Sequence, residues 1–270
     1  MVVSINTNAG TMSALQALNR TSKDLAASQM RITTGLKVNG PKDNAATFAI
    51  VQNMRGDIAG IGAVKNALAL GESTVDVAID GATAVSDLLV EMKSKAVDAS
   101  QSGLAGASQT ALHEEFTALR NQITTVVAGV DFNGKNLIES GASNLSVLSS
   151  VESSTIVVMA QPIDTTTLGI HTATLSNSSN ATTAVTLISQ AIVEVSSALT
   201  ALGTSSRGLE IQHEFTSKLV DVLKESVGTL VDADLAAEVE ALQIKEQLGV
   251  AGLSIANGRP RAILGLFSGD

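Results

Sequence analysis

Apolar residues recur at alternating steps of three and four near the start of the chain, and the tail mirrors this pattern less regularly. Such steps place side chains on one face of a helix, so each end is predicted to be helical. The first helix covers Thr11 to Leu36, and the second covers Asp232 to Asn257, with Asp232 or Asp234 as its capping start. The repeated apolar positions are Leu15, Leu18, Leu25, Ile32 and Leu36 in the first and Leu235, Val239, Leu242, Leu248, Leu253 and Ile255 in the second.

Both terminal helices are predicted to need partners. Ser22 and Gln29 interrupt the first apolar stripe, and an isolated helix depends on tertiary packing for most of its stability. The last helix has a second apolar face, because Ile244 and Val250 lie off its main stripe. One face can pair with the N-terminal helix, and the other must meet something else.

Three further helices are predicted between the ends, from Asn44 to about Ser100, from Ser108 to Ala128, and from about Ala184 to Gly228. Their buried faces are expected at Leu88, Leu89, Met92 and Ala96, and at Leu112, Phe116, Leu119, Ile123 and Val126. The segment from Lys37 to Asn44 contains Gly40-Pro41, which breaks the first helix from the second and suggests a hinge.

The stretch from Val130 to about Thr183 has a different pattern. Asp131-Phe132-Asn133-Gly134 is typical of a turn, and the segments 145–148 and 155–159 are predicted to be short strands. Ser and Thr are abundant from Ser140 onward, which favours a solvated surface excursion. The same richness leaves open a surface for glycan attachment.

The composition suits helix seams better than a ligand pocket. Of the 270 residues 44% are hydrophobic but only 2% are aromatic, whereas pockets are usually lined by aromatic side chains. The net charge is −9, and the 17 Lys and Arg residues are dispersed, which argues against nucleic-acid binding. There is no Cys, so a disulfide or a Cys-based metal site is excluded.

The sequence carries no pattern for a membrane or for classical secretion. Met1 to Asn6 lack the basic start and apolar core of a signal peptide, so export would need a machine that recognises no cleavable signal. No continuous apolar run reaches the ~18 residues that span a bilayer, and we expect no membrane insertion.

Two His-Glu pairs, His113-Glu114 and His213-Glu214, begin like a zinc-protease helix. Neither has a second His four residues on, which would place two ligands on one helix face. We therefore predict no metal site and interpret the histidines as solvated or capping side chains.

Other candidate motifs also have simpler explanations. Gly56, Gly60 and Gly62 hint at a dinucleotide loop, but no strand precedes them, and a close helix-packing face is favoured. The carboxylates of Asp76, Asp80, Asp87 and Glu91 are best explained as an exposed helix face, since no apolar pocket accompanies them. We predict no catalytic residue and no cofactor.

Several longer motifs resemble those of bacterial flagellins. Ser4 to Asn8, Ser28 to Asn39 and Lys42 to Ala46 resemble the N-terminal signature of that family. Leu230 to Glu238 and Ser254 to Leu266 resemble its C-terminal motifs. The Phe132-Asn133-Gly134 turn also falls where flagellins have one.

The resemblance implies a mainly α fold, an elongated antiparallel helical bundle or coiled coil formed by the N- and C-terminal segments, with a small β-containing middle. Residues 1–36 and 230–270 would be the inner-core helices, joined to the rest through the linker 37–43. Residues 44–129 and 184–229 would form an outer-tube helical domain. Residues 130–183 would be a β-hairpin and Ser/Thr-rich surface region.

The resemblance implies a structural role rather than an enzymatic one: a secreted subunit that polymerises with itself into the extracellular flagellar filament, the propeller for swimming. Expected partners are an export chaperone, the filament cap and the hook-junction proteins. A hook–filament junction protein shares the terminal-helix plan and is the alternative, which the match at Ser4 to Asn8 disfavours. A flagellin with a protease in its middle domain would need a metal triad and a large insertion, and both are missing.

Two groups of residues follow from the resemblance. Flagellins recognised by the mammalian innate flagellin receptor carry an Arg and a Leu on the first long helix, where this chain has Glu91 and Lys95, while Glu115 matches the acidic residue of that patch. Replacing a cation by an anion predicts poor receptor activation. Subunit packing is expected at Leu15, Leu18, Leu25, Ile32, Leu36, Leu235, Val239, Leu242, Leu248, Leu253 and Leu266.

Overall fold

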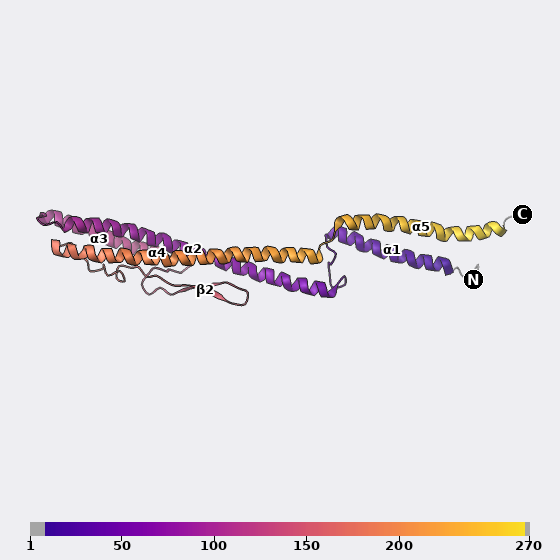
Figure 1. The fold of residues 1–270 in the computed structure, drawn as a ribbon, viewed down its shortest axis with the longest axis horizontal. Coiled ribbons are helices and arrows are strands. Elements are labelled where there is room, and N and C mark those ends of the chain that lie inside the picture. The colour runs from indigo at the N-terminus through magenta and orange to yellow at the C-terminus, as the bar shows by residue number, and fades with distance from the viewer. Residues whose placement is uncertain (1–8, 268–270) are drawn as a thin grey trace. The chain divides into compact units, whose positions relative to one another are not determined.

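The computed structural model describes residues 9–267, and it describes the side chains of residues 12–252 except that of Ala14. The chain is mainly helical, as predicted (Figure 1). The elements are α1 (Ala9–Thr34), α2 (Ala45–Ala99), α3 (Gly106–Gly129), β1 (Leu145–Leu148), β2 (Thr155–Val158), α4 (Ser178–Val231) and α5 (Leu235–Phe267).

The chain divides into two compact units. The terminal unit comprises residues 1–56 and 222–270, and the central unit comprises residues 57–221. Within the terminal unit, α1 and α5 lie side by side and run in opposite directions (Figure 1). The predicted pairing of the N- and C-terminal segments is therefore confirmed.

The core of the central unit is built from helix faces with a spacing of three and four residues. Phe116, Ile123 and Val127 of α3 pack there with residues of α2 and α4. Many of the side chains at the seam are Ala or Val, which permits close approach of the helix backbones. The buried positions are Val64, Leu68, Val75, Ala78, Ala82, Val85, Leu89, Met92, Ala96 and Ala99 in α2, and Ala181, Ala184, Ile188, Ala191, Val195, Ala198, Leu202 and Leu209 in α4.

The middle region is more buried than its Ser/Thr content suggests. Strands β1 and β2 form an antiparallel pair in which Leu145 lies opposite Val158 and Leu148 opposite Thr155. The irregular segment after β2 contributes further apolar side chains to the core. The buried residues of the whole region are Val130, Leu137, Ile138, Val147, Val158, Ile163, Leu168, Ile170, Ala173 and Leu175. The stretch is therefore not a fully solvated excursion, because these apolar side chains lie in the core while many of the polar side chains between them are exposed.

Glycines on α2 let this middle region approach the helix. A Cβ at Gly60 would lie 2.8 Å from Cγ1 of Val151, and one at Gly71 would lie 2.6 Å from Cγ2 of Val147. At Gly81 a Cβ would overlap Cγ2 of Val130. The three glycines are about three helical turns apart, so they lie on one side of α2.

Several sequence expectations differ from the structure in detail. Helix α4 begins at Ser178 rather than near Ala184, and α5 continues past Pro260 to Phe267. A Cβ added at Gly56 or Gly62 would have no neighbour within 4 Å. A Cβ at Gly60 would contact Val151, in the turn between the strands. The glycines therefore do not form the helix-packing face that was favoured for them.

Substituting Gly81 by Ala is expected to destabilise the central unit. The added methyl group would clash with Val130 and lie 3.1 Å from Cδ1 of Ile138. Overpacking of this kind costs about 1–3 kcal/mol, which outweighs the gain of up to about 1 kcal/mol from the higher helix propensity of Ala. Denaturant unfolding measures the difference.

Gly62 of the same helix provides the matched control. Its position has nothing within 4 Å, so Gly62→Ala should raise the free energy of unfolding. Equal effects of the two substitutions would show that the glycine at position 81 is not required for packing.

Candidate assembly interface

Three contacts define how α1 and α5 pair. Leu36 forms a β-bridge with Asp232, Arg31 forms an ion pair with Glu238 at 2.7 Å, and a Cβ at Gly249 would lie 3.7 Å from Cγ2 of Thr21. The residue numbers of each pair sum to nearly the same value, as expected for one continuous antiparallel register. This pairing forms the framework on which the predicted packing residues are placed.

On α1, the face toward α5 is only partly the predicted stripe. Leu18, Leu25 and Ile32 are half-buried, but Leu15 is 57% exposed. The intervening positions are occupied by half-buried Thr21 and by Ser28, which is 1% exposed, whereas Ser22 and Gln29 are exposed. The prediction of Ser22 and Gln29 at the seam is therefore wrong.

On α5, most predicted packing residues do not face α1. The half-buried positions between 238 and 249 are Glu238, Ala241, Leu242, Lys245 and Gly249. Leu242 is the one large apolar residue predicted in this helix that is half-buried among the described side chains. The exposed fractions are 48% for Leu235, 41% for Val239 and 64% for Leu248, and the side chains of Leu253 and Leu266 lie outside the described residues.

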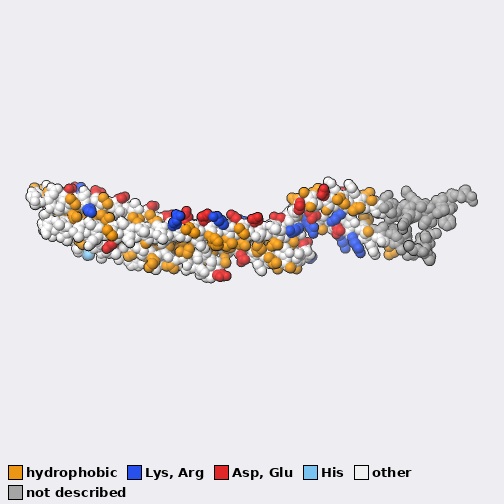
Figure 2. All heavy atoms as spheres, in the orientation of Figure 1, with side chains coloured by type: hydrophobic (Ala, Val, Ile, Leu, Met, Phe, Trp, Pro, Cys, Tyr) orange, Lys and Arg blue, Asp and Glu red, His pale blue; other side chains and the backbone are white. Residues whose placement is uncertain are grey.

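The exposed apolar residues of α5 lie on two flanks of its seam. At about 100° per residue, Leu235, Val239 and Val250 lie on one side of Glu238 and Lys245, and Ile244 and Leu248 lie on the other. Ile244 and Val250 are 55% and 66% exposed. Figure 2 shows hydrophobic side chains on the surface of the described part of this helix. We call these five residues the α5 flanks.

The connector after α1 is held by hydrogen bonds rather than free. Gly35, with φ +72°, ends α1, and its carbonyl oxygen accepts a hydrogen bond from the Ala233 N–H at 2.8 Å. The Lys37 N–H donates to the Val231 carbonyl oxygen at 2.7 Å, and Val38 packs with Val51 and Val231. Leu36 is half-buried against this small core. These contacts fix residues 35–38, so nothing at the beginning of the connector supports the suggested hinge.

The first turns of α2 and α5 are capped by side chains. The Asn44 Oδ1 atom accepts the N–H of Thr47 at 3.0 Å. The Asp234 Oδ1 atom accepts the N–H groups of Ala236 and Ala237 at 3.1 and 3.2 Å. Of the two predicted capping residues for the last helix, Asp234 is therefore the one that caps it.

An ion pair supports the seam between α1 and α5. The Arg31 Nη1 atom donates to Oε1 of Glu238, whose side chain is 16% exposed. This hydrogen bond, together with the hydroxyl of Ser28, holds the pKa of Glu238 below its ordinary value, although partial burial acts in the opposite direction. The carboxylate form is therefore favoured in the folded chain.

The three positions of the predicted receptor patch lie close together in the central unit. The Lys95 Nζ atom forms an ion pair with Oε2 of Glu115 at 2.6 Å. The hydrogen bond and charge of Glu115, and the charges of Glu91 and Asp98, raise the pKa of Lys95. Glu91 is exposed, so the surface there is acidic.

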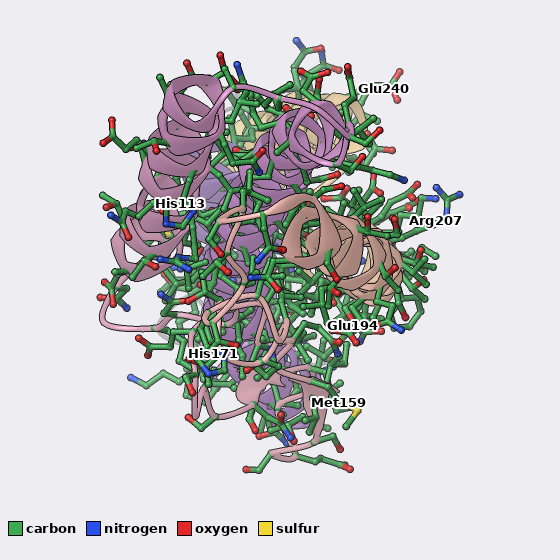
Figure 3. All side chains as sticks on the ribbon, turned by 90° about the vertical axis from the view of Figure 1, so that its left-hand side faces the viewer. His113, Met159, His171, Glu194, Arg207 and Glu240 are labelled. Carbon is green, nitrogen blue, oxygen red and sulfur yellow. The ribbon has the colours of Figure 1, made fainter. Side chains whose placement is uncertain are left out.

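One polar row was missed in the sequence. On α3, Gln109, His113 and Arg120 hold the backbone of the segment before α4. The Gln109 Nε2 atom donates to the Leu175 carbonyl oxygen at 2.6 Å, and His113 Nδ1 accepts the Leu175 N–H at 3.1 Å. Arg120 donates to the carbonyl oxygens of His171 and Ala173, both at 3.0 Å. His113 and His171, which belong to the two segments held together here, are labelled in Figure 3.

The spacing of this row was the available indication. His113 lies one helical turn after Gln109, and Arg120 lies three turns after it. The three side chains therefore share one face of α3, next to the buried Phe116. The interpretation of His113 as a solvated or capping side chain is wrong, because it accepts a hydrogen bond from a distant segment. No group of three or more metal-ligating side chains occurs among the described residues.

Comparison with known proteins matches both helical ends of the chain to family models. Residues 5–143 match the bacterial flagellin N-terminal helical region, and residues 185–267 match the bacterial flagellin C-terminal helical region. The chain belongs to the bacterial flagellin family. It is therefore a structural, non-enzymatic protein, the subunit of the extracellular flagellar filament, and it polymerises with itself.

Flagellins that align over nearly their whole length are among its relatives. Flagellin FljK of Caulobacter vibrioides is 42% identical over 268 residues, and flagellin FljO of the same organism is 41% identical, with 98% of both sequences covered in each case. A flagellin of Brucella melitensis is 32% identical over 99% of this chain and all of its own length.

Two solved structures share the fold at low identity. Bacillus cereus flagellin has a TM-score of 0.52 and 19% identity, over 56% of this chain and 88% of its own. A putative flagellar hook-associated protein from Vibrio parahaemolyticus has a TM-score of 0.59 and 14% identity, over 70% of this chain and all of its own. These two similarities concern the fold alone, so the second does not favour the hook–filament junction alternative.

Among the described residues of this flagellin, α4 alone is long and apolar enough to cross a membrane by length and composition. The sequence expectation considered only continuous apolar runs and did not identify this helix. Ala184, Ile188 and Val195 of α4 are buried in the core, and a core helix of a soluble protein meets the same criterion.

The ion pair between α1 and α5 predicts an acid-sensitive contribution to stability. Since folding lowers the pKa of Glu238 below 4.5, its contribution is complete above that pH and is lost as the pH falls through the lowered pKa. We expect Glu238→Gln to cost about 0.5–1 kcal/mol at neutral pH, because the pair is partly exposed, and to cost progressively less as the pH falls through the lowered pKa of Glu238.

Thermal unfolding of the whole chain at several pH values tests this expectation. Glu240→Gln is the matched control, because Glu240 is exposed and has no ion pair among the described residues. A cost of Glu238→Gln that does not change with pH would contradict the assignment.

Proposed function

We propose that copies of this flagellin assemble through the α5 flanks, together with the exposed apolar side chains of α1. One observation carries the proposal: α5 pairs with α1 through Glu238, Leu242, Lys245 and Gly249, and this leaves the flanks in solvent. A helix with apolar residues on two sides of an already occupied face can be covered by two further neighbours.

The energy available from covering the flanks is large. Full burial of a Leu, Ile or Val side chain is worth about 1.5–3 kcal/mol. On α1, Met12, Leu15 and Met30 are 61%, 57% and 57% exposed, and they add to the apolar surface. Because each copy would use these residues in contacts with several neighbours, the gain would be repeated along a polymer.

The domain assignment is based on the resemblance to flagellins. We propose that the helices of residues 1–36 and 230–270 form the inner core of the filament and that residues 44–129 and 184–229 form the tube around them. The linker 37–43 would join these layers, and residues 130–183 would lie at the surface. The predicted packing residues Leu253 and Leu266 would belong to the same inner core.

The same surface bears on the predicted partners. An apolar flank that is exposed before assembly favours non-specific association. An export chaperone that covers the C-terminal helix would prevent this association. The hook-junction proteins would contact the same flanks before polymerisation begins, and the filament cap would contact them while it proceeds. These partners are proposed from the exposed surface of the single chain.

Leu248→Asp is expected to abolish polymerisation without unfolding the chain. Leu248 is 64% exposed, so the change should leave the helix content of the monomer unchanged, while a charge buried at an interface costs several kcal/mol. Purified protein is mixed with sheared filament seeds, and growth is followed by electron microscopy.

The control is Gln247→Asp, which adds the same charge at the adjacent exposed position. It should elongate far better than Leu248→Asp. If Leu248→Asp forms filaments at the rate of the unsubstituted chain, the α5 flanks are not the assembly surface.

We also propose that this flagellin activates the mammalian flagellin receptor poorly. The proposal rests on the exposed anion Glu91 and on Lys95, whose charge is already engaged by Glu115 at 2.6 Å. A reporter-cell assay should give a weak response, and Glu91→Arg should strengthen it. A potent response from the unsubstituted protein would contradict the proposal.

A further inference from the structure

A two-residue hairpin follows α3 and contains an Asn-Gly sequence. Phe132 and Lys135 exchange two backbone hydrogen bonds, of 3.0 and 3.1 Å, and the turn residues Asn133 and Gly134 have φ values of +55° and +75°. Positive φ at both central positions is the geometry of a type I′ turn, for which Asn-Gly is a preferred sequence. Both residues are exposed.

An Asn-Gly bond is chemically vulnerable. The backbone nitrogen of the glycine can attack Cγ of the asparagine, forming a new N–C bond while the bond between Cγ and the amide nitrogen Nδ2 breaks. The displaced nitrogen leaves as ammonia with the glycine N–H proton. Water then opens the cyclic imide to aspartate or isoaspartate. The attack requires loss of the glycine N–H proton and an approach of the resulting electron pair to Cγ.

In this turn a carboxylate occupies the direction of that electron pair. The Gly134 N–H donates to Oδ1 of Asp131 at 3.0 Å. The N–H direction therefore points to Asp131 rather than to Cγ of Asn133. The negative charge of the carboxylate also opposes removal of the proton, since this would place two anions in contact.

A second Asn-Gly sequence has the same arrangement in another part of the chain. In the connector after α1, the N–H groups of Asn39 and Gly40 donate to Oδ2 of Asp43 at 2.9 and 3.1 Å. The aspartate lies three residues after the glycine here, whereas Asp131 lies three residues before Gly134. In both local folds, the N–H group of the glycine that follows the asparagine therefore donates to a carboxylate.

We propose that Asp131 and Asp43 are protective residues that keep Asn133 and Asn39 from deamidating in the folded protein. The sequence has a third Asn-Gly pair, Asn257-Gly258, whose side chains lie outside the described residues. The proposal concerns the chemistry of the turns and does not depend on which surface drives polymerisation.

Damage at Asn133 would affect packing. Isoaspartate inserts a methylene group into the backbone, and the turn lies between Val130, which packs against Gly81, and the buried Asn136. The Asn136 amide donates to the Val127 carbonyl oxygen at 2.7 Å and accepts the Ile138 N–H at 2.9 Å. A filament component outside the cell has no access to intracellular repair, so slow deamidation is of direct value.

The test compares deamidation at each site in the purified, folded protein. Unsubstituted protein, Asp131→Ala and Asp43→Ala are incubated at mildly alkaline pH, and the peptides containing Asn133 and Asn39 are measured by mass spectrometry for the mass increase and for isoaspartate. Circular dichroism confirms that each variant keeps its helix content.

We expect Asp131→Ala to accelerate deamidation at Asn133 roughly tenfold, the factor for losing one charge-assisted hydrogen bond, with Asn39 unchanged. Asp43→Ala should accelerate deamidation at Asn39 by a similar factor and leave the rate at Asn133 unchanged. Asp131→Asn, which keeps an acceptor but no charge, should fall between. In denaturant, the unsubstituted protein and Asp131→Ala should deamidate equally fast at Asn133.

Two results with folded Asp131→Ala would overturn the proposal, and a third would come from the unsubstituted protein. One is an unchanged rate at Asn133 in folded Asp131→Ala. The other is a slower rate, which would mean that the carboxylate assists removal of the N–H proton. Equal rates at Asn133 in the folded and the denatured unsubstituted protein would also contradict protection.

Discussion

The pairing of α1 with α5 is the contact on which the rest of the terminal unit depends, and the proposed mode of assembly is built on it. The seam contains Thr21, Ser28 and Gly249 as well as leucines, and it is supported by the ion pair of Arg31 with Glu238. Such a seam aligns two helices in one register while using only Leu242 among the large apolar side chains that the structure describes in α5. The pairing therefore holds the helix in place while the α5 flanks stay available.

The central unit solves a different packing problem with the same kind of residues. Its helices meet through Ala- and Val-rich faces, and Gly71 and Gly81 let the β-containing middle lie directly on α2. Small side chains at these seams explain how a protein with 2% aromatic residues can form a well-packed core. The cost is sensitivity to any added methyl group at the glycines.

Periodicity predicted the helices well and their partners less well. Steps of three and four identify a helix face, so the five helices and the stripe of Leu18, Leu25 and Ile32 could be predicted. They do not tell which of two apolar faces meets a neighbour in the same chain. For this reason Leu235, Val239 and Leu248 were expected at one packed stripe, whereas they are exposed in the single chain.

The spacing of the polar row on α3 was visible in the sequence, but the distant segment that it contacts could not be predicted. The hydrogen bonds of Gln109 and His113 to Leu175 depend on an irregular segment whose path has no periodic pattern. The burial of the Ser/Thr-rich middle was missed for the same reason. By contrast, the Asn-Gly turn was predicted from local sequence, because a type I′ turn is specified by its own two residues.

The central claim is that the α5 flanks are exposed in the monomer and covered in the polymer. The protein has no Cys, so Leu248→Cys introduces a single thiol whose alkylation rate can be measured in both states. The account predicts rapid labelling of the monomer and labelling at least roughly tenfold slower in filaments, because burial of the thiol restricts access. Equal labelling rates in monomer and filament would contradict it.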